Sequence, residues 1–226
     1  TKLGHIVLLA ISAIAVVFVA PLTAQEPNFG RAIAMTPTDL VIGQPVNWYG
    51  PGTVYAYSAS QEGWEEPQLL TAPDSSRMDD FGHAIAVDGN TMAIGTPRKH
   101  DQAGAVYVFT RIGDVWNQQS YIKPSNIGEL AQGQEFGDGD QFGAALTLSD
   151  DGNVLAISAI TEDSGSPGIN GDEADNSERS AGAVYIFQRN ENTWAQSTYV
   201  KASNPGNGDL FGYSVALTAN GRRLVV

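Results

Sequence analysis

The sequence predicts an all-β fold, a β-propeller built from four-stranded antiparallel blades. One segment pattern recurs four times, and within each round the apolar residues alternate with period two rather than with the helical period of 3.6. A Phe-Gly pair opens every round, at residues 29–30, 81–82, 142–143 and 211–212. The first three rounds are 52, 61 and 69 residues long. Repeats of roughly this size are typical of propeller blades, and a β-solenoid, whose repeats are usually shorter, is the alternative.

The second round shows the expected strands most clearly. Residues 81–87 alternate large and small side chains, which predicts a first strand with one crowded face. The Asp-Gly-Asn turn at 88–90 leads into a second strand over 91–95, because Asp-Gly and Asn-Gly tolerate the positive φ of tight hairpins. A third strand is expected over 105–110. The fourth, about 116–122, is polar and therefore suits the outer edge of a blade.

A second signature within the rounds fixes their register. Gly-x-Val-Tyr occurs at 52–55, 104–107 and 182–185, and a tryptophan follows each of these glycines after 12 residues, at Trp64, Trp116 and Trp194. This constant spacing favours a packing role between blades over stacking on sugars. The connections vary instead: 22 residues separate Gly82 from Gly104, but 39 separate Gly143 from Gly182. Variable connections between constant units predict surface loops.

Composition and charge exclude several classes of function. The 226 residues include no cysteine, so disulfides and thiolate metal sites are excluded. A net charge of −13 argues against a nucleic-acid partner, which requires a basic face. Twelve carboxylates and no Lys or Arg lie between Pro124 and Glu178. This acidic stretch is either a solubilising surface or a cation site.

Residues 1–24 read as a signal peptide. A lysine precedes the 15-residue run from Ile6 to Ala20, which is apolar except for Ser12, and a small residue, Ala24, stands before the expected cleavage point. The run is shorter than the ~20 residues of a membrane span, with an uncleaved membrane anchor as the alternative. We therefore expect an exported protein, extracellular or at the cell surface, with the periplasm as a further option. Residues 25–226 then form a partial propeller of three blades and the start of a fourth, within a longer gene product.

The repeated motifs resemble the FG-GAP repeats of the integrin α-chain β-propeller, which also occur in exported bacterial proteins. Besides the four Phe-Gly pairs, Gly43-Gln44-Pro45 and Gly95-Thr96-Pro97 match the second family segment. Ser158-Ala159-Ile160 departs from it, so that turn of the third unit need not share the family geometry. The Gly-Ala-Val-Tyr motif with its tryptophan is similar to the bacterial branch. The resemblance covers residues 28–226 and implies about seven blades in the full protein.

The resemblance also raises the question of calcium. Family blades bind Ca²⁺ in acidic hairpins between the first two strands, but the hairpins at 88–90 and 150–153 are too short and too poor in acids. The long connection of the third unit offers a different candidate site, with Glu162 and Asn176 nearby and Asp138 and Asp140 just before a strand. The predicted calcium ligands are Asp163, Asn170, Asp172 and Asp175. A solvated acidic loop is the alternative, and no other cofactor is expected.

The sequence gives little support to catalysis. His5 belongs to the leader, His83 lies on a predicted first strand, and His100 has Asp101 beside it but no nucleophile placed with it. We therefore predict no catalytic residues and no enzyme activity. The resemblance implies a non-catalytic binding module for cell-surface adhesion or recognition, with a protein or surface glycan as ligand and membrane contact only through an uncleaved anchor. The alternatives are an accessory propeller domain of a larger secreted enzyme and a structural surface or matrix protein.

Overall fold

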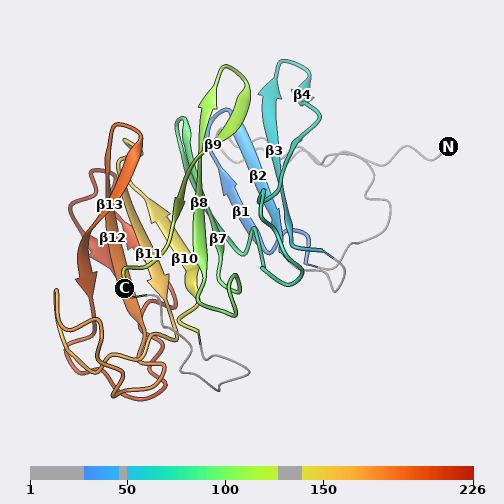
Figure 1. The fold of residues 1–226 in the computed structure, drawn as a ribbon. Helices are drawn as coiled ribbons and strands as arrows, with labels where there is room; N and C mark the ends of the chain where they lie inside the picture. The colour runs from blue at the N-terminus through green and yellow to red at the C-terminus, as the bar shows by residue number, and fades with distance from the viewer. Residues whose placement is uncertain (1–27, 46–49, 127–138) are drawn as a thin grey trace, which may run out of the picture.

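The computed structural model describes residues 28–45, 50–126 and 139–226. The predicted signal peptide and Asp138 lie outside these residues. The described part of the chain is built of β-strands, and no helix in it is long and apolar enough to cross a membrane. Three antiparallel sheets and a short two-stranded sheet follow one another along the chain (Figure 1). The predicted all-β architecture of four-stranded propeller blades is confirmed.

Each sheet is one blade. In blades 2 and 3 the strands lie in sequence order from one edge to the other, whereas in blade 1 both β4 and β5 pair with β3. Blade 1 contains β1 (Ala32–Met35), β2 (Asp39–Gln44), β3 (Thr53–Ser60), β4 (Gly63–Trp64) and β5 (Gln68–Leu70). Blade 2 contains β6 (Ala84–Asp88), β7 (Thr91–Thr96), β8 (Ala105–Ile112) and β9 (Val115–Ile122). Blade 3 contains β10 (Phe142–Leu148), β11 (Val154–Ala159), β12 (Ala183–Asn190) and β13 (Thr193–Val200). The fourth unit contributes the pair β14 (Ala216–Leu217) and β15 (Leu224–Val225).

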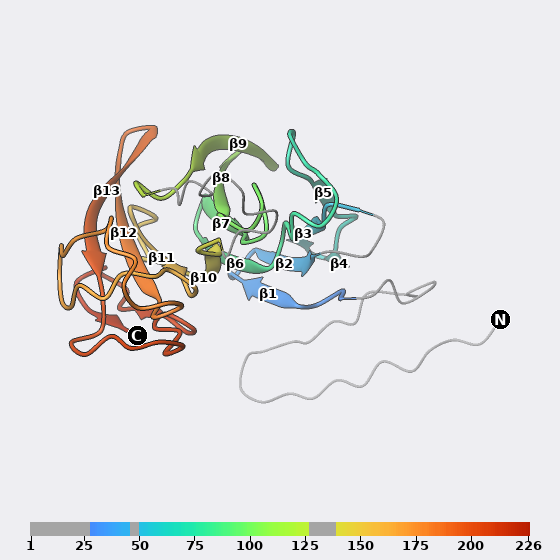
Figure 2. The ribbon, with the colours of Figure 1, turned by 60° about the horizontal axis from the view of Figure 1, so that its bottom comes forward.

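The first strands lie closest together, and the fourth strands lie outermost (Figure 2). In blade 2 the sequence predicted that the first strand begins at Phe81, but it begins at Ala84. Asp80 and Gly82 both have positive φ, 70° and 91°, outside the range typical of β-strands, and the pairing of β6 with β7 begins at Ala84. Phe81 and Gly82 instead form a turn against the preceding blade.

Neighbouring blades pack through two clusters of buried side chains. In the first, small and aliphatic residues of blade 1, such as Val54 and Ala56, meet large residues of blade 2, such as Phe81 and Tyr107. The second repeats this arrangement between blades 2 and 3, with Phe142 among the large residues. Each blade therefore has an aliphatic face and an aromatic face, and the aromatic face covers the aliphatic face of the blade before it.

A backbone hydrogen bond repeats at every blade junction. The amide of Phe81 donates to the carbonyl of Pro51 at 3.0 Å. Phe142 and Phe211 make the same bond to Ala103 and Ala181, at 3.1 and 2.8 Å. The Phe-Gly pair that names the family segment thus ties the start of each unit to the third-strand start of the unit before it.

Glycine pairs permit the close approach of the blades. A Cβ atom on Gly43 would lie 2.2 Å from the carbonyl oxygen of Gly82, and one on Gly95 would lie 2.1 Å from that of Gly143. At the third junction Ser158 stands in the equivalent position, and its Oγ accepts a hydrogen bond from the amide of Ala145 at 2.8 Å. The β10–β11 register also shifts there, between Phe142 and Leu146. The β6–β7 pairing of blade 2 has no such shift, so the first two strands pair differently in blades 2 and 3.

We predict that Gly95→Ala will destabilise the protein by at least ~2 kcal/mol, because an added methyl group would collide with the backbone of Gly143. Gly206→Ala is the matched control, since the nearest atom to its Cβ would be the flexible Asp209 carboxylate at 3.3 Å. The control should change stability by only about 0.5 kcal/mol. Urea denaturation of both variants measures the difference, and equal effects would contradict the steric explanation.

Candidate functional site

The two ends of the blades differ in the kind of connection that they carry. One end, here called the hairpin face, carries the short turns within strand pairs. The other end, here called the linker face, carries the connections between second and third strands and the linkers between blades (Figure 1). The linker face of blade 3 carries residues 160–182, here called the insert, whereas blade 2 has only residues 97–104 at the same place. We take the insert and its base as the candidate site.

Backbone pairing with β13 holds the insert in place. Ile169 forms an antiparallel bridge with Val200, and the amide of Asn170 donates to the carbonyl of Tyr199 at 2.8 Å. The amide of Lys201 donates to the carbonyl of Gly168 at 2.8 Å. The insert therefore covers the end of an outer edge strand that would otherwise expose unpaired backbone groups.

The insert also reaches the linker between blades 2 and 3. The Glu173 carboxylate accepts hydrogen bonds from Ser125 Oγ and from Gln196 Nε2, the latter at 2.7 Å. Asn126 Nδ2 donates to the Glu173 carbonyl at 2.8 Å. These bonds connect the insert to the linker between blades 2 and 3 and to β13.

A buried ion pair lies at the base of the insert. Lys201 Nζ lies 2.7 Å from Glu162 Oε2, and Tyr199 donates its hydroxyl to Glu162 Oε1 at 2.8 Å. Both charged side chains are almost completely buried. Burial, followed by the neighbouring Glu162, raises the pKa of Tyr199. In such a place removal of one partner leaves an uncompensated charge, at a cost of about 3–5 kcal/mol.

The equivalent position in blade 2 carries the opposite charge. Lys99 stands four residues after the second-strand glycine, as Glu162 stands four residues after Ser158. The Lys99 ammonium is buried and lies 3.1 Å from Asp79 Oδ2 and 2.8 Å from the Asp74 carbonyl oxygen. Blades 2 and 3 therefore each have a buried ion pair at this position, but the equivalent residue is a lysine in blade 2 and a glutamate in blade 3.

This inversion changes the surroundings of Asp140. It stands two residues before Phe142, as Asp79 stands two residues before Phe81, but the residue opposite is Glu162 instead of a lysine. Asp140 is buried, and its carboxylate makes no hydrogen bond within the described residues. Burial raises the pKa of Asp140 to about 7, with Glu162 and Asp163 acting in the same direction and Lys201 opposing them.

The four predicted calcium ligands all lie in the insert, but their oxygen atoms accept backbone hydrogen bonds, three from the insert itself and that of Asn170 from β13. Asp163 Oδ1 accepts from the amide of Ser180 at 2.6 Å, and Asn170 Oδ1 accepts from Tyr199 at 2.9 Å. The other two carboxylates accept from the amides of Ala174 and Gly165: Asp172 Oδ1 at 2.9 Å and Asp175 Oδ2 at 2.8 Å.

Among the described residues no group of three or more His, Asp or Glu side chains is placed to share a metal ion. Calcium binding at Asp163, Asn170, Asp172 and Asp175 stays a prediction to which this geometry adds no support. Its test is the melting temperature with and without millimolar calcium. A rise that Asp172→Ala removes would support the prediction, and an unchanged melting temperature in the unmodified chain would contradict it.

The histidines of the described region have separate partners. His83 Nδ1 lies 3.1 Å from Asp80 Oδ2, and His100 Nε2 lies 2.9 Å from the Tyr121 hydroxyl oxygen. Burial lowers the pKa of His100, and the charges of Lys123 and Lys99 act in the same direction. His5 lies outside the described residues.

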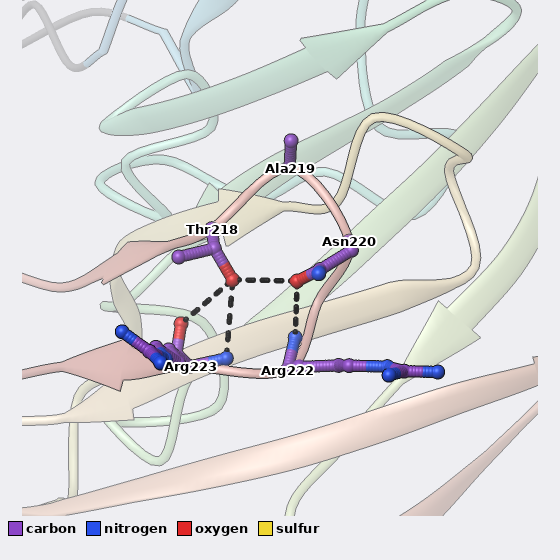
Figure 3. Close-up of a pocket in the computed structure, with 5 residues that line it drawn as sticks. All are labelled: Thr218, Ala219, Asn220, Arg222 and Arg223. Carbon is purple, nitrogen blue, oxygen red and sulfur yellow. Dashed lines mark hydrogen bonds between the residues drawn. The ribbon is translucent and has the colours of Figure 1, made fainter.

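A shallow hollow of about 460 Å³ lies at the β14–β15 turn. It is lined by Thr218, Ala219, Asn220, Arg222 and Arg223. Asn220 Oδ1 accepts from the Thr218 hydroxyl at 2.9 Å and from the Arg222 amide at 3.1 Å. Figure 3 shows that the two arginine side chains extend to opposite sides of the turn. They therefore do not converge on a common anion.

Two of the three recurring tryptophans, Trp116 and Trp194, contribute to packing between blades, as predicted. Trp116 is buried in the cluster between blades 1 and 2, and Trp194 packs against the cluster between blades 2 and 3. The guanidinium groups of Arg111 and Arg189 lie 5.7 and 6.0 Å from the respective indole centroids. Trp64 is partly buried and belongs to neither cluster.

Two sets of side-chain hydrogen bonds at the blade junctions were not predicted from the sequence. Arg111 bonds to Asp39 of the blade before it, and Arg189 bonds to Thr91 Oγ1 at 3.0 Å. The tyrosine of each Gly-Ala-Val-Tyr motif also donates to the preceding linker: Tyr107 to Asp74 at 2.5 Å, and Tyr185 to Asn126 at 2.6 Å. The signal was present, because each acceptor follows its blade's tryptophan at the constant spacing of ten residues.

Together these repeated blades define a β-propeller repeat protein. A comparison with protein families agrees: residues 64–109 match the family model described as FG-GAP repeat. This stretch therefore matches the FG-GAP repeat, a unit of β-propeller modules of the integrin α type, as the Phe-Gly motifs had suggested. The match extends from Trp64 in β4 of blade 1 to Phe109 in β8 of blade 2. A comparison with curated proteins finds no match.

We predict that the stability of the protein falls as the pH rises from about 4 to about 7, and that Asp140→Asn removes part of this fall. The unfolded Asp140 ionises near 3.8, whereas the folded one keeps its proton up to about 7. The folded state therefore binds more protons in this window, and its advantage is lost as the pH increases. Above pH 7 the variant should be more stable by on the order of 2–4 kcal/mol.

Urea denaturation across this pH range measures the effect. Asp114→Asn removes an exposed carboxylate from the β8–β9 turn and controls for the change in net charge. If Asp140→Asn and Asp114→Asn shift the pH profile equally, the explanation from burial is wrong.

Proposed function

We propose that this chain is an exported, non-catalytic binding module for cell-surface adhesion or recognition, and that the linker face of blade 3 contacts the ligand. Its ligand is a protein or a surface glycan, and it has no nucleic-acid partner. The leader directs export, with an uncleaved leader as the only membrane contact. The observation that carries the proposal is the insert, a long connection held by its own hydrogen bonds on a repetitive scaffold.

The contrast between the two faces supports this proposal. Turns on the hairpin face are short, whereas the insert adds a folded surface beyond the blade. Its buried base, Glu162 with Lys201, and its pairing with β13 fix the position of this surface. A binding surface that is ordered before contact loses less conformational entropy on association than a flexible loop does.

The exposed side chains of the insert suit recognition. Ile169 is 70 % exposed although its backbone pairs with Val200, so its side chain is held outward by ordered structure. Asp172 is exposed on the same loop. In binding interfaces a few side chains that become buried contribute most of the binding free energy, and the contacts around them exclude water.

We predict that Ile169→Ala will weaken binding to the cell-surface ligand by roughly tenfold, the loss expected when one anchoring side chain is truncated. Ile112→Ala is the matched control: Ile112 is 72 % exposed, but it lies at the β8–β9 turn on the hairpin face. Both substitutions should leave the melting temperature almost unchanged because both side chains face solvent.

The assay is saturation binding of the full chain to intact cells, to isolated surface glycans and to matrix proteins. Weaker binding of the Ile112 variant with normal binding of the Ile169 variant would move the site to the hairpin face. No saturable binding to any of these surfaces would contradict the proposed function itself.

A further inference from the structure

The sequence contains three Asn-Gly pairs, and their hydrogen bonds differ. They are Asn170–Gly171 in the insert, Asn207–Gly208 in the linker after β13, and Asn220–Gly221 in the β14–β15 turn. All three asparagines are exposed. In such a pair the glycine amide nitrogen can attack the carboxamide carbon of the asparagine, because glycine has no side chain to hinder the approach. The local sequence is therefore equally permissive at all three places.

The attacking nitrogen is engaged in two of the pairs. The amide of Gly208 donates to the Arg179 carbonyl at 2.9 Å, and the amide of Gly221 donates to the Thr218 carbonyl at 2.8 Å. Attack at these sites first requires that the bond be broken. The amide of Gly171, by contrast, donates no hydrogen bond within the described part of the chain. Its nitrogen is available.

The carboxamide under attack is polarised at Asn170. Its Oδ1 accepts a hydrogen bond from the Tyr199 amide at 2.9 Å. This oxygen becomes negative in the tetrahedral intermediate, and a fixed backbone donor stabilises that charge as an oxyanion hole does. Asn220 Oδ1 also accepts bonds, from Thr218 and Arg222, but there the glycine nitrogen is engaged. Among the three pairs only Asn170–Gly171 combines a free nucleophile with a polarised carbonyl.

We propose that Asn170 is a site of spontaneous deamidation. The Gly171 nitrogen loses its proton to solvent base and forms a bond to Cγ of Asn170. The bond from Cγ to the carboxamide nitrogen breaks, and that nitrogen takes up a proton and leaves as ammonia. Water then opens the resulting five-membered succinimide at either carbonyl, which gives aspartate or isoaspartate. No other reactant is required.

Either product changes the insert. Aspartate adds a negative charge to a loop that already contains Asp172 and Asp175, which increases the repulsion within the loop. Isoaspartate inserts a methylene group into the backbone between Asn170 and Gly171, next to the bridge from Ile169 to Val200. The reaction therefore alters the surface that the insert presents.

The test incubates the purified 226-residue chain at mildly alkaline pH, in buffer and in concentrated urea. Digestion followed by liquid chromatography and mass spectrometry then quantifies aspartate and isoaspartate at each of the three pairs over time. In buffer we expect conversion at Asn170 to be roughly tenfold faster than at Asn207 or Asn220, the ratio given by about one hydrogen bond. In urea the three rates should converge, because the folded hydrogen bonds are absent.

Two results decide the proposal. A rate at Asn170 in buffer that equals or falls below those at Asn207 and Asn220 would overturn it, because all three are measured in the same molecules. Gly171→Ala should slow conversion at Asn170 in buffer and in urea and leave the other two sites unchanged. Conversion at Asn170 that this substitution does not slow would exclude the Gly171 nitrogen as the attacking group.

Discussion

The close approach of backbone to backbone at the blade junctions is the constraint on which the rest of the structure depends. Gly43 against Gly82 and Gly95 against Gly143 leave no room for a Cβ atom. This contact brings the Phe-Gly amide within hydrogen-bond distance of the preceding blade. It also sets the depth to which Phe81 enters the aliphatic face of blade 1. At the third junction Ser158 stands in place of the second-strand glycine, and the Phe211 amide still donates to the Ala181 carbonyl at 2.8 Å.

Because the junctions are fixed, the blades differ in the length and charge of the connections at their ends, and they differ most on the linker face. The inverted ion pairs illustrate this. Lys99 and Glu162 occupy equivalent positions, yet each finds a partner within reach, Asp79 in one case and Lys201 in the other. The exchange leaves Asp140 without a cation of its own, and its raised pKa records that cost. Blade 3 thus combines an ordered insert with a less favourable charge arrangement beneath it.

Much of the fold could be predicted from the sequence, because each blade repeats the same local pattern. The Asp-Gly turns lie at the expected hairpins, but the start of β6 was placed three residues too early and the fifth strand of blade 1 was not expected. The candidate site was harder to predict from the sequence. Asp140, Glu162 and Lys201 are distant in sequence, and their proximity depends on how the insert returns to β13. An acidic composition alone did not reveal that the insert carboxylates accept backbone hydrogen bonds.

The residue before each Phe-Gly pair shows how the backbone constraint outweighs side-chain preference. Asn28, Asp80, Gln141 and Leu210 all have left-handed φ values of 69°, 70°, 55° and 54°. Asn and Asp tolerate this conformation, but for Gln and Leu it costs on the order of 1 kcal/mol. The strain persists because the turn must deliver the phenylalanine amide to the carbonyl of the preceding blade. At this position the blade junction determines the conformation, and the amino acid only determines how much free energy that conformation costs.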